Sequence, residues 1–86
     1  MKLYFFRKDD CDPCIAAKPK VEEIAQRSGA ELIVLDLADK ANWVKAAYLK
    51  VKAAPTLVVT DDGGQRIAGM TGKLINVDRA LTILGR

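Results

Sequence analysis

Short apolar runs bounded by charged or turn residues predict four β-strands along the chain. The runs cover residues 2–6, 31–36, 56–60 and 65–70. Residues 31–36 are continuously apolar between their terminal acids, so we expect a strand buried on both faces, as in parallel sheets. Residues 61–64 read Asp-Asp-Gly-Gly, a tight-turn sequence that should join the last two strands as a hairpin.

Apolar residues spaced three and four apart predict three amphipathic helices, one after each of the first two strands and one near the C-terminus. The expected apolar faces are Cys14, Ala17, Val21, Ile24 and Ser28 in the first helix, Val44, Ala47, Tyr48 and Val51 in the second, and Leu74, Val77, Leu81 and Leu84 in the last. Gly29 should end the first helix, and Asn76 should cap the last. Trp43 is expected in the core or along a groove, as is Tyr48.

The predicted element order is β-α-β-α-β-β-α, which is typical of an α/β fold with a four-stranded mixed sheet flanked by helices. Right-handed crossovers would make the first three strands parallel, and the hairpin would add an antiparallel fourth strand at one edge. With 86 residues, the chain should form a single domain spanning residues 1–86, because two cores would each be too small to be stable.

Composition narrows the function classes. Half of the residues are hydrophobic and 29% are charged, a profile typical of a globular fold, and no apolar run is long enough to span a bilayer. The net charge of +3 is spread along the chain, so we expect no nucleic-acid partner. The chain has no His and only two Cys, too few ligands for a structural zinc site. The first apolar stretch is too short for a signal peptide, which favours a cytoplasmic protein.

The strongest chemical signal is Cys11-Asp12-Pro13-Cys14, between the first strand and the first helix. Residues three apart on a helix have Cβ atoms about 5–6 Å apart, so small adjustments allow a disulfide. The partial positive charge of the helix N-terminus favours a thiolate at Cys11. We expect Cys11 to be the more exposed sulfur and the nucleophile, with Cys14 as the shielded resolving thiol.

Together these residues resemble the thioredoxin/glutaredoxin superfamily, over essentially the whole chain. The matching features are the Cys11 to Cys14 pair, Pro19, Glu22-Glu23-Ile24-Ala25, Ala54-Pro55-Thr56 and Gly72. The resemblance implies a minimal thioredoxin fold in which Pro55 is cis and lies against the cysteine pair, and in which the backbone of Ala54 pairs with a peptide substrate. The expected substrate-binding residues are Ala54, Pro55, Thr56, Asp12 and Pro13.

Three departures from the family pattern concern the cysteine pair. Asp10 replaces the aromatic residue usual before the first cysteine, and Phe5 stands where many members carry a buried acid. Asp12 lies between the cysteines in place of the more familiar Gly or Pro. The three acids at positions 9, 10 and 12 should oppose stabilisation of a Cys11 thiolate, whereas nearby basic residues such as Arg7 should offset them.

The sequence therefore predicts a small, monomeric thiol-disulfide oxidoreductase that reduces protein disulfides by cycling Cys11 and Cys14. It would need no metal or bound cofactor, only an electron donor such as a thioredoxin-reductase-type enzyme or glutathione. Two alternatives remain open. One is a glutaredoxin-like reductase of glutathione mixed disulfides, and the other is a non-catalytic binding module that uses the same groove.

Overall fold

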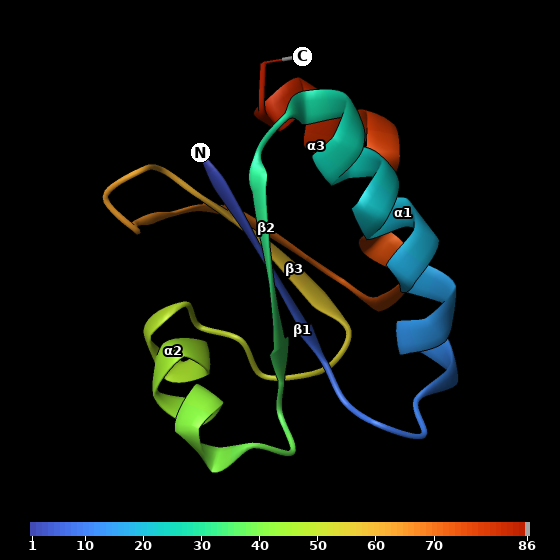
Figure 1. The fold of residues 1–86 in the computed structure, drawn as a ribbon, viewed down its shortest axis with the longest axis vertical. Helices are drawn as coiled ribbons and strands as arrows, with labels where there is room; N and C mark the ends of the chain where they lie inside the picture. Colours follow the sequence, from blue (N-terminus) through green and yellow to red (C-terminus); the bar gives the residue numbers. More distant parts are fainter. Residues whose placement is uncertain (86) are drawn as a thin grey trace.

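Four strands form one mixed sheet in the order β2-β1-β3-β4 in the computed structural model, which describes residues 1–85 (Figure 1). The strands are β1 (Lys2–Arg7), β2 (Glu31–Asp36), β3 (Thr56–Thr60) and β4 (Arg66–Thr71), and the helices are α1 (Asp12–Ser28), α2 (Trp43–Tyr48) and α3 (Val77–Ile83). Short 3₁₀ turns, η1 (Lys40–Asn42) and η2 (Gly72–Leu74), precede α2 and α3. The predicted element order and the mixed sheet are confirmed.

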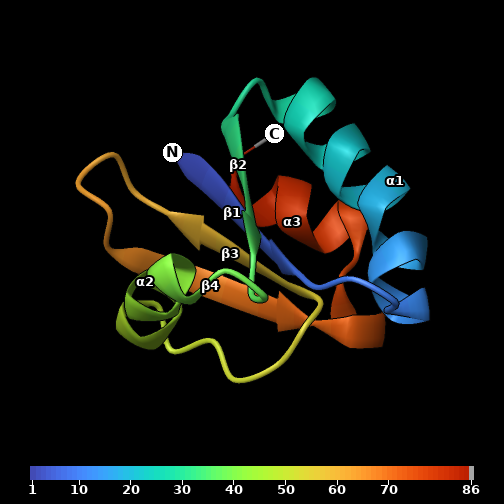
Figure 2. The same ribbon diagram turned by 60° about the horizontal axis from the view of Figure 1, so that its bottom comes forward.

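The helices cover both faces of the sheet. Side chains alternate along β1, so that Leu3 and Phe5 pack against α1 and α3, whereas Tyr4 and Phe6 pack against α2. Figures 1 and 2 both show α1 and α3 together on one side of the sheet and α2 alone on the other. The larger core is therefore the one beneath α1, the helix that carries both cysteines.

The direction of β3 was predicted wrongly. β1 and β2 are parallel, but β3 runs antiparallel to β1, with Thr56 beside Phe6. The helix in the connection does not cross the sheet: the six residues of α2 rise only about 9 Å, whereas a six-residue strand spans about 20 Å. The chain therefore returns to the end of the sheet that it left, and β3 starts beside the end of β1.

The prediction that residues 31–36 are buried on both faces is also wrong. β2 is an edge strand with β1 as its one neighbour, and the side chain of Val34 is 54% exposed. An unbroken apolar run does not distinguish a central strand from an edge strand that is covered mainly on one side.

The first helix follows its predicted face closely. Cys14, Ala17, Val21, Ile24 and Ser28 are the buried residues of α1, and Gly29 ends the helix with a φ of +74°. The side chain of Asn76 caps α3 by accepting a hydrogen bond from the backbone N–H of Arg79 at 2.9 Å, as predicted.

The predicted face of the second helix is wrong. Ala46 and Leu49 are buried against the sheet, whereas Trp43, Val44 and Tyr48 are exposed. The helix is too short for its apolar spacing to set its orientation, and the cluster around Phe6 selects the face that is buried. Leu74 is likewise exposed because it lies in η2 and not in the last helix.

Arg66 connects β4 to the end of α2. Its guanidinium donates hydrogen bonds to the backbone oxygens of Leu49, at 2.7 Å, and Lys50, at 3.3 Å. The same group lies over Gly69, where an added Cβ would collide with it. The missing side chain of Gly69 thus makes room for Arg66.

We predict that Gly69→Ala destabilises the protein by about 1 kcal/mol, because the displaced guanidinium loses its bonds to α2. In an Arg66→Ala background the same change should be neutral or slightly stabilising, since alanine restricts the unfolded chain more than glycine does. Urea unfolding of the two single variants and the double variant measures this. Equal destabilisation in both backgrounds would show that the cost lies in the β4 backbone and not in Arg66.

Candidate active site

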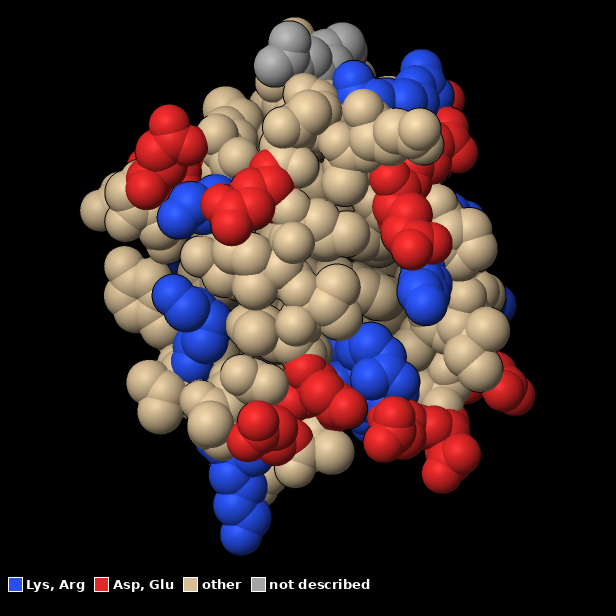
Figure 3. Space-filling view, viewed as in Figure 1, with Lys and Arg blue, Asp and Glu red and all other residues tan. Residues whose placement is uncertain are grey.

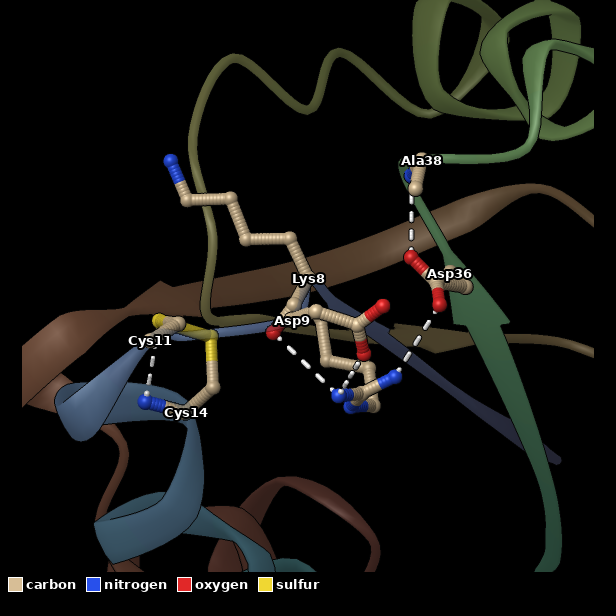
Figure 4. Close-up of polar contacts among 7 residues, drawn as sticks. Lys8, Asp9, Cys11, Cys14, Asp36 and Ala38 are labelled. Carbon is tan, nitrogen blue, oxygen red and sulfur yellow. Dashed lines mark hydrogen bonds and ion pairs between the residues drawn. A yellow bond between two sulfur atoms is a disulfide. The ribbon is translucent and has the colours of Figure 1, made fainter.

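The two cysteines lie in the first turn of α1 and are joined by a disulfide, with their Cα atoms 5.2 Å apart (Figure 4). Cys11 is the N-cap residue, in extended conformation, and its Sγ accepts a hydrogen bond from the backbone N–H of Cys14 at 3.2 Å. Pro13 follows within the first turn, where a missing N–H costs no helical hydrogen bond. A sulfur thus takes the place of the oxygen that normally caps a helix.

Burial differs only slightly between the two cysteines. Cys11 is 7% exposed and Cys14 is 3% exposed. The order matches the expectation that Cys11 is the more accessible sulfur, but both residues are buried in this oxidised form.

An ion-pair network lies beside the disulfide at the end of the sheet (Figure 4). Arg7 donates to Asp9 at 3.0 Å and to Asp36 at 3.2 Å, and Asp36 also accepts from the backbone N–H of Ala38 at 2.9 Å. The hydrogen bond to Asp9, together with the charge of Asp36, holds the pKa of Arg7 above its ordinary value despite partial desolvation. Of the three acids near the cysteines, Asp9 is the one that pairs with a cation, and it shares that cation with Asp36.

Asp36 was missed by the sequence analysis. It lies 29 residues from Arg7, and only the parallel pairing of β1 with β2 places the two opposite each other. The remaining acids, Asp10 and Asp12, make no ion pair within residues 1–85. Of these two, Asp12 lies in the first turn of α1, between the cysteines, so its charge acts directly at the site.

Pro55 lies at the start of β3, and the Ala54–Pro55 peptide bond is cis, as the resemblance implied. The backbone oxygen of Pro55 accepts a hydrogen bond from the N–H of Gly72 at 2.9 Å. Because β3 starts where β1 ends, Pro55 is at the same end of the sheet as the cysteine pair. The Ala54 residue is half-buried there.

Thr56 lies beneath this surface. It is buried, and its hydroxyl donates to the backbone oxygen of Ala53 at 2.7 Å and shares a hydrogen bond with the hydroxyl of Thr71 at 3.0 Å. Its side chain therefore fixes the loop that leads into Pro55. The place of Thr56 among the substrate-binding residues stays a prediction.

Two hollows flank the N-terminal half of α1. One, of about 470 Å³, opens between α1 and β2, and its lining includes Cys14, Phe5 and Val34. The other, of about 310 Å³, lies between α1 and η2. Phe5, which stands where many family members carry a buried acid, is paired with Val34 across β1 and β2. The wall of the hollow beside Cys14 is therefore apolar on both strands.

Within residues 1–85, no three His, Cys, Asp or Glu side chains gather closely enough to hold a metal ion. None of the helices in the described part of the chain combines the length and hydropathy that crossing a membrane requires. On the face shown in Figure 3, acidic and basic side chains are interspersed and form no continuous basic stripe.

The chain was compared with known proteins. No family model matches it. A thioredoxin of Mycolicibacterium smegmatis is 37% identical over 67 residues, which are 73% of this chain and 60% of that protein, so the match spans about three fifths of the relative's length.

Solved structures extend the similarity to the whole fold. Thioredoxin 1 of Thermosipho africanus superposes with a TM-score of 0.73 at 27% identity, covering 100% of both chains. A mutant thioredoxin of Halobacterium salinarum gives a TM-score of 0.79 at 29% identity, covering 95% of this chain and 69% of that one. With the cysteine pair, the cis-proline and the sheet order all in place, the chain belongs to the thioredoxin/glutaredoxin superfamily.

Proposed function

We propose that this protein is a thiol-disulfide oxidoreductase that reduces disulfides in other proteins. The observation that carries the proposal is the Cys11–Cys14 disulfide in the first turn of α1, where one sulfur also caps the helix. A pair held in this way can open and close within a single helical turn. The similarity to thioredoxins supports the same assignment.

The reaction begins with the reduced pair. The Cys11 thiolate attacks one sulfur of the substrate disulfide, so that a Cys11–substrate bond forms and the other substrate sulfur leaves as a thiolate, which takes a proton from water. The positive end of α1 and the N–H of Cys14 both favour the anionic form of Cys11.

Cys14 completes the reaction. After losing its proton it attacks Cys11 Sγ, the Cys11–Cys14 bond forms, and the second substrate thiol is released. The hollow that Cys14 lines between α1 and β2 gives that proton a path to solvent, which matters because no carboxylate stands at the position of Phe5. Two electrons have then passed to the substrate, and an external thiol donor must return them.

We predict that Cys11→Ser and Cys14→Ser both abolish the reduction of a protein disulfide, for different reasons. The first variant lacks the nucleophile, whereas the second should accumulate a mixed disulfide with its substrate, because no second thiol displaces the substrate sulfur from Cys11. Insulin reduction followed by mass spectrometry measures both effects. If the unaltered protein does not reduce insulin and both variants still bind a protein partner as it does, the chain is a binding module that does not use its cysteines.

A comparison of two electron donors tests the proposed function in a second way. With insulin as substrate, we expect turnover with a thioredoxin-reductase-type enzyme and NADPH that exceeds turnover with glutathione and glutathione reductase. The opposite order, together with faster reduction of glutathione mixed disulfides than of insulin, would favour the glutaredoxin-like alternative.

The charge of Asp12 gives a prediction for the titration of the Cys11 thiolate. Because Asp12 is next to Cys11 and has no ion-pair partner in the described residues, Asp12→Asn should move the midpoint of the Cys11 thiolate titration to lower pH by about 0.3 to 0.8 units. Thiolate absorbance of the reduced protein measures this. Glu31→Gln, at the opposite end of the sheet, is the matched control and should leave the midpoint unchanged. A midpoint that rises in Asp12→Asn would contradict the assignment.

A further inference from the structure

We propose that the hollow between α1 and η2 is a specificity subsite for disulfide substrates that carry a negatively charged side chain three or four residues from the reacting cysteine. The inference rests on the proposed function, since it concerns the chain that flanks the disulfide during the reaction. It names a class of substrate that neither the fold nor the cysteine pair specifies.

The hollow is continuous with the reactive pair. Asp12 and Pro13, the two residues between the cysteines, line one end of it, and Gly72 lines the side formed by η2. The N–H of Gly72 is hydrogen-bonded to the backbone oxygen of Pro55, so the cis-proline is joined directly to the η2 side of the hollow. Figure 2 shows η2 beside the N-terminal part of α1, against which it packs.

The lining of the hollow is mainly apolar, and several of its residues are small. Ala16 and Ala17 contribute methyl groups, and Gly72 contributes none. Gly72 has a φ of +57°, a conformation that L residues adopt rarely. An extended polypeptide can therefore lie close to the backbone along this face of α1.

The far end of the hollow is positively charged. Lys20 from α1 and Lys73 from η2 both line it, and both are exposed. Neither lysine makes an ion pair with a carboxylate of the described residues. Two lysines from elements far apart in sequence thus contribute to one hollow, mostly through their apolar stems, and their exposed side chains can bring their ammonium groups to a carboxylate bound there.

The distance between Asp12 and Lys20 along α1 sets the position of that carboxylate in the substrate. Lys20 is eight residues after Asp12, which corresponds to about 12 Å along a helix. An extended chain covers about 3.3 Å per residue, so about three to four residues separate the substrate cysteine from an acid that reaches the lysines. A basic side chain at that position would meet both lysines instead.

The test uses three peptides, each with a single cysteine and each oxidised to its symmetrical disulfide. The peptides differ only at the third and fourth residues before and after the cysteine. These positions carry Glu in the first peptide, Ala in the second and Lys in the third. Pre-reduced protein is mixed with each peptide, the reaction is quenched with acid, and the second-order rate constant is measured. Each value is divided by the rate constant of dithiothreitol with the same peptide, which removes the intrinsic reactivity of the disulfide.

We expect the normalised rate constant to be about three- to tenfold higher for the Glu peptide than for the Lys peptide. Lys20→Glu and Lys73→Glu should each reduce or invert this preference, and 1 M NaCl should weaken it. Arg79→Glu makes the same change in net charge on α3, outside the hollow, and should preserve it.

Two kinds of failure are distinguishable. If all three peptides are reduced at equal normalised rates, or if Arg79→Glu lowers the preference as much as Lys73→Glu does, the subsite is refuted and the proposed function stands. If none of the peptides is reduced, the proposed function itself fails.

Discussion

The site depends on the first turn of α1, where a helix cap and a reactive sulfur are the same atom. The N–H groups that begin a helix have no acceptor within it, and Cys11 Sγ accepts one of them from Cys14. A thiolate is a stronger acceptor than a sulfur in a disulfide, so reduction should strengthen this contact. Opening the disulfide therefore leaves the helix capped, and the chemistry requires no change in the fold.

The rest of the site forms because three strands begin or end at the same end of the sheet. β1 ends just before Cys11, and the antiparallel β3 begins there with the cis Pro55. β4 then leads into η2, where Gly72 is hydrogen-bonded to Pro55. Had β3 run parallel to β1, Pro55 would lie at the opposite end of the sheet. The antiparallel direction of β3 thus has a functional consequence, because it brings Pro55 to the cysteine end of the sheet.

Local features were predictable from the sequence, and features that depend on distant pairing were not. The 17-residue α1 repeats its apolar spacing often enough to fix its buried face, and the cysteines lie three residues apart at its start. The six-residue α2 has too few repeats, so its face was predicted wrongly, and the direction of β3 after it was predicted wrongly too. Asp36 beside Arg7, and Lys20 near Lys73, are brought together only by the folded chain.

The most direct test is a redox titration of the purified protein in glutathione buffers of defined ratio, with thiols alkylated and counted by mass spectrometry at each ratio. A couple that opens and closes within one helical turn should pass from two modified cysteines to none in a single reversible two-electron step. Persistent glutathione adducts on one cysteine, disulfide-linked dimers, or a bridge that no buffer ratio reopens would contradict it.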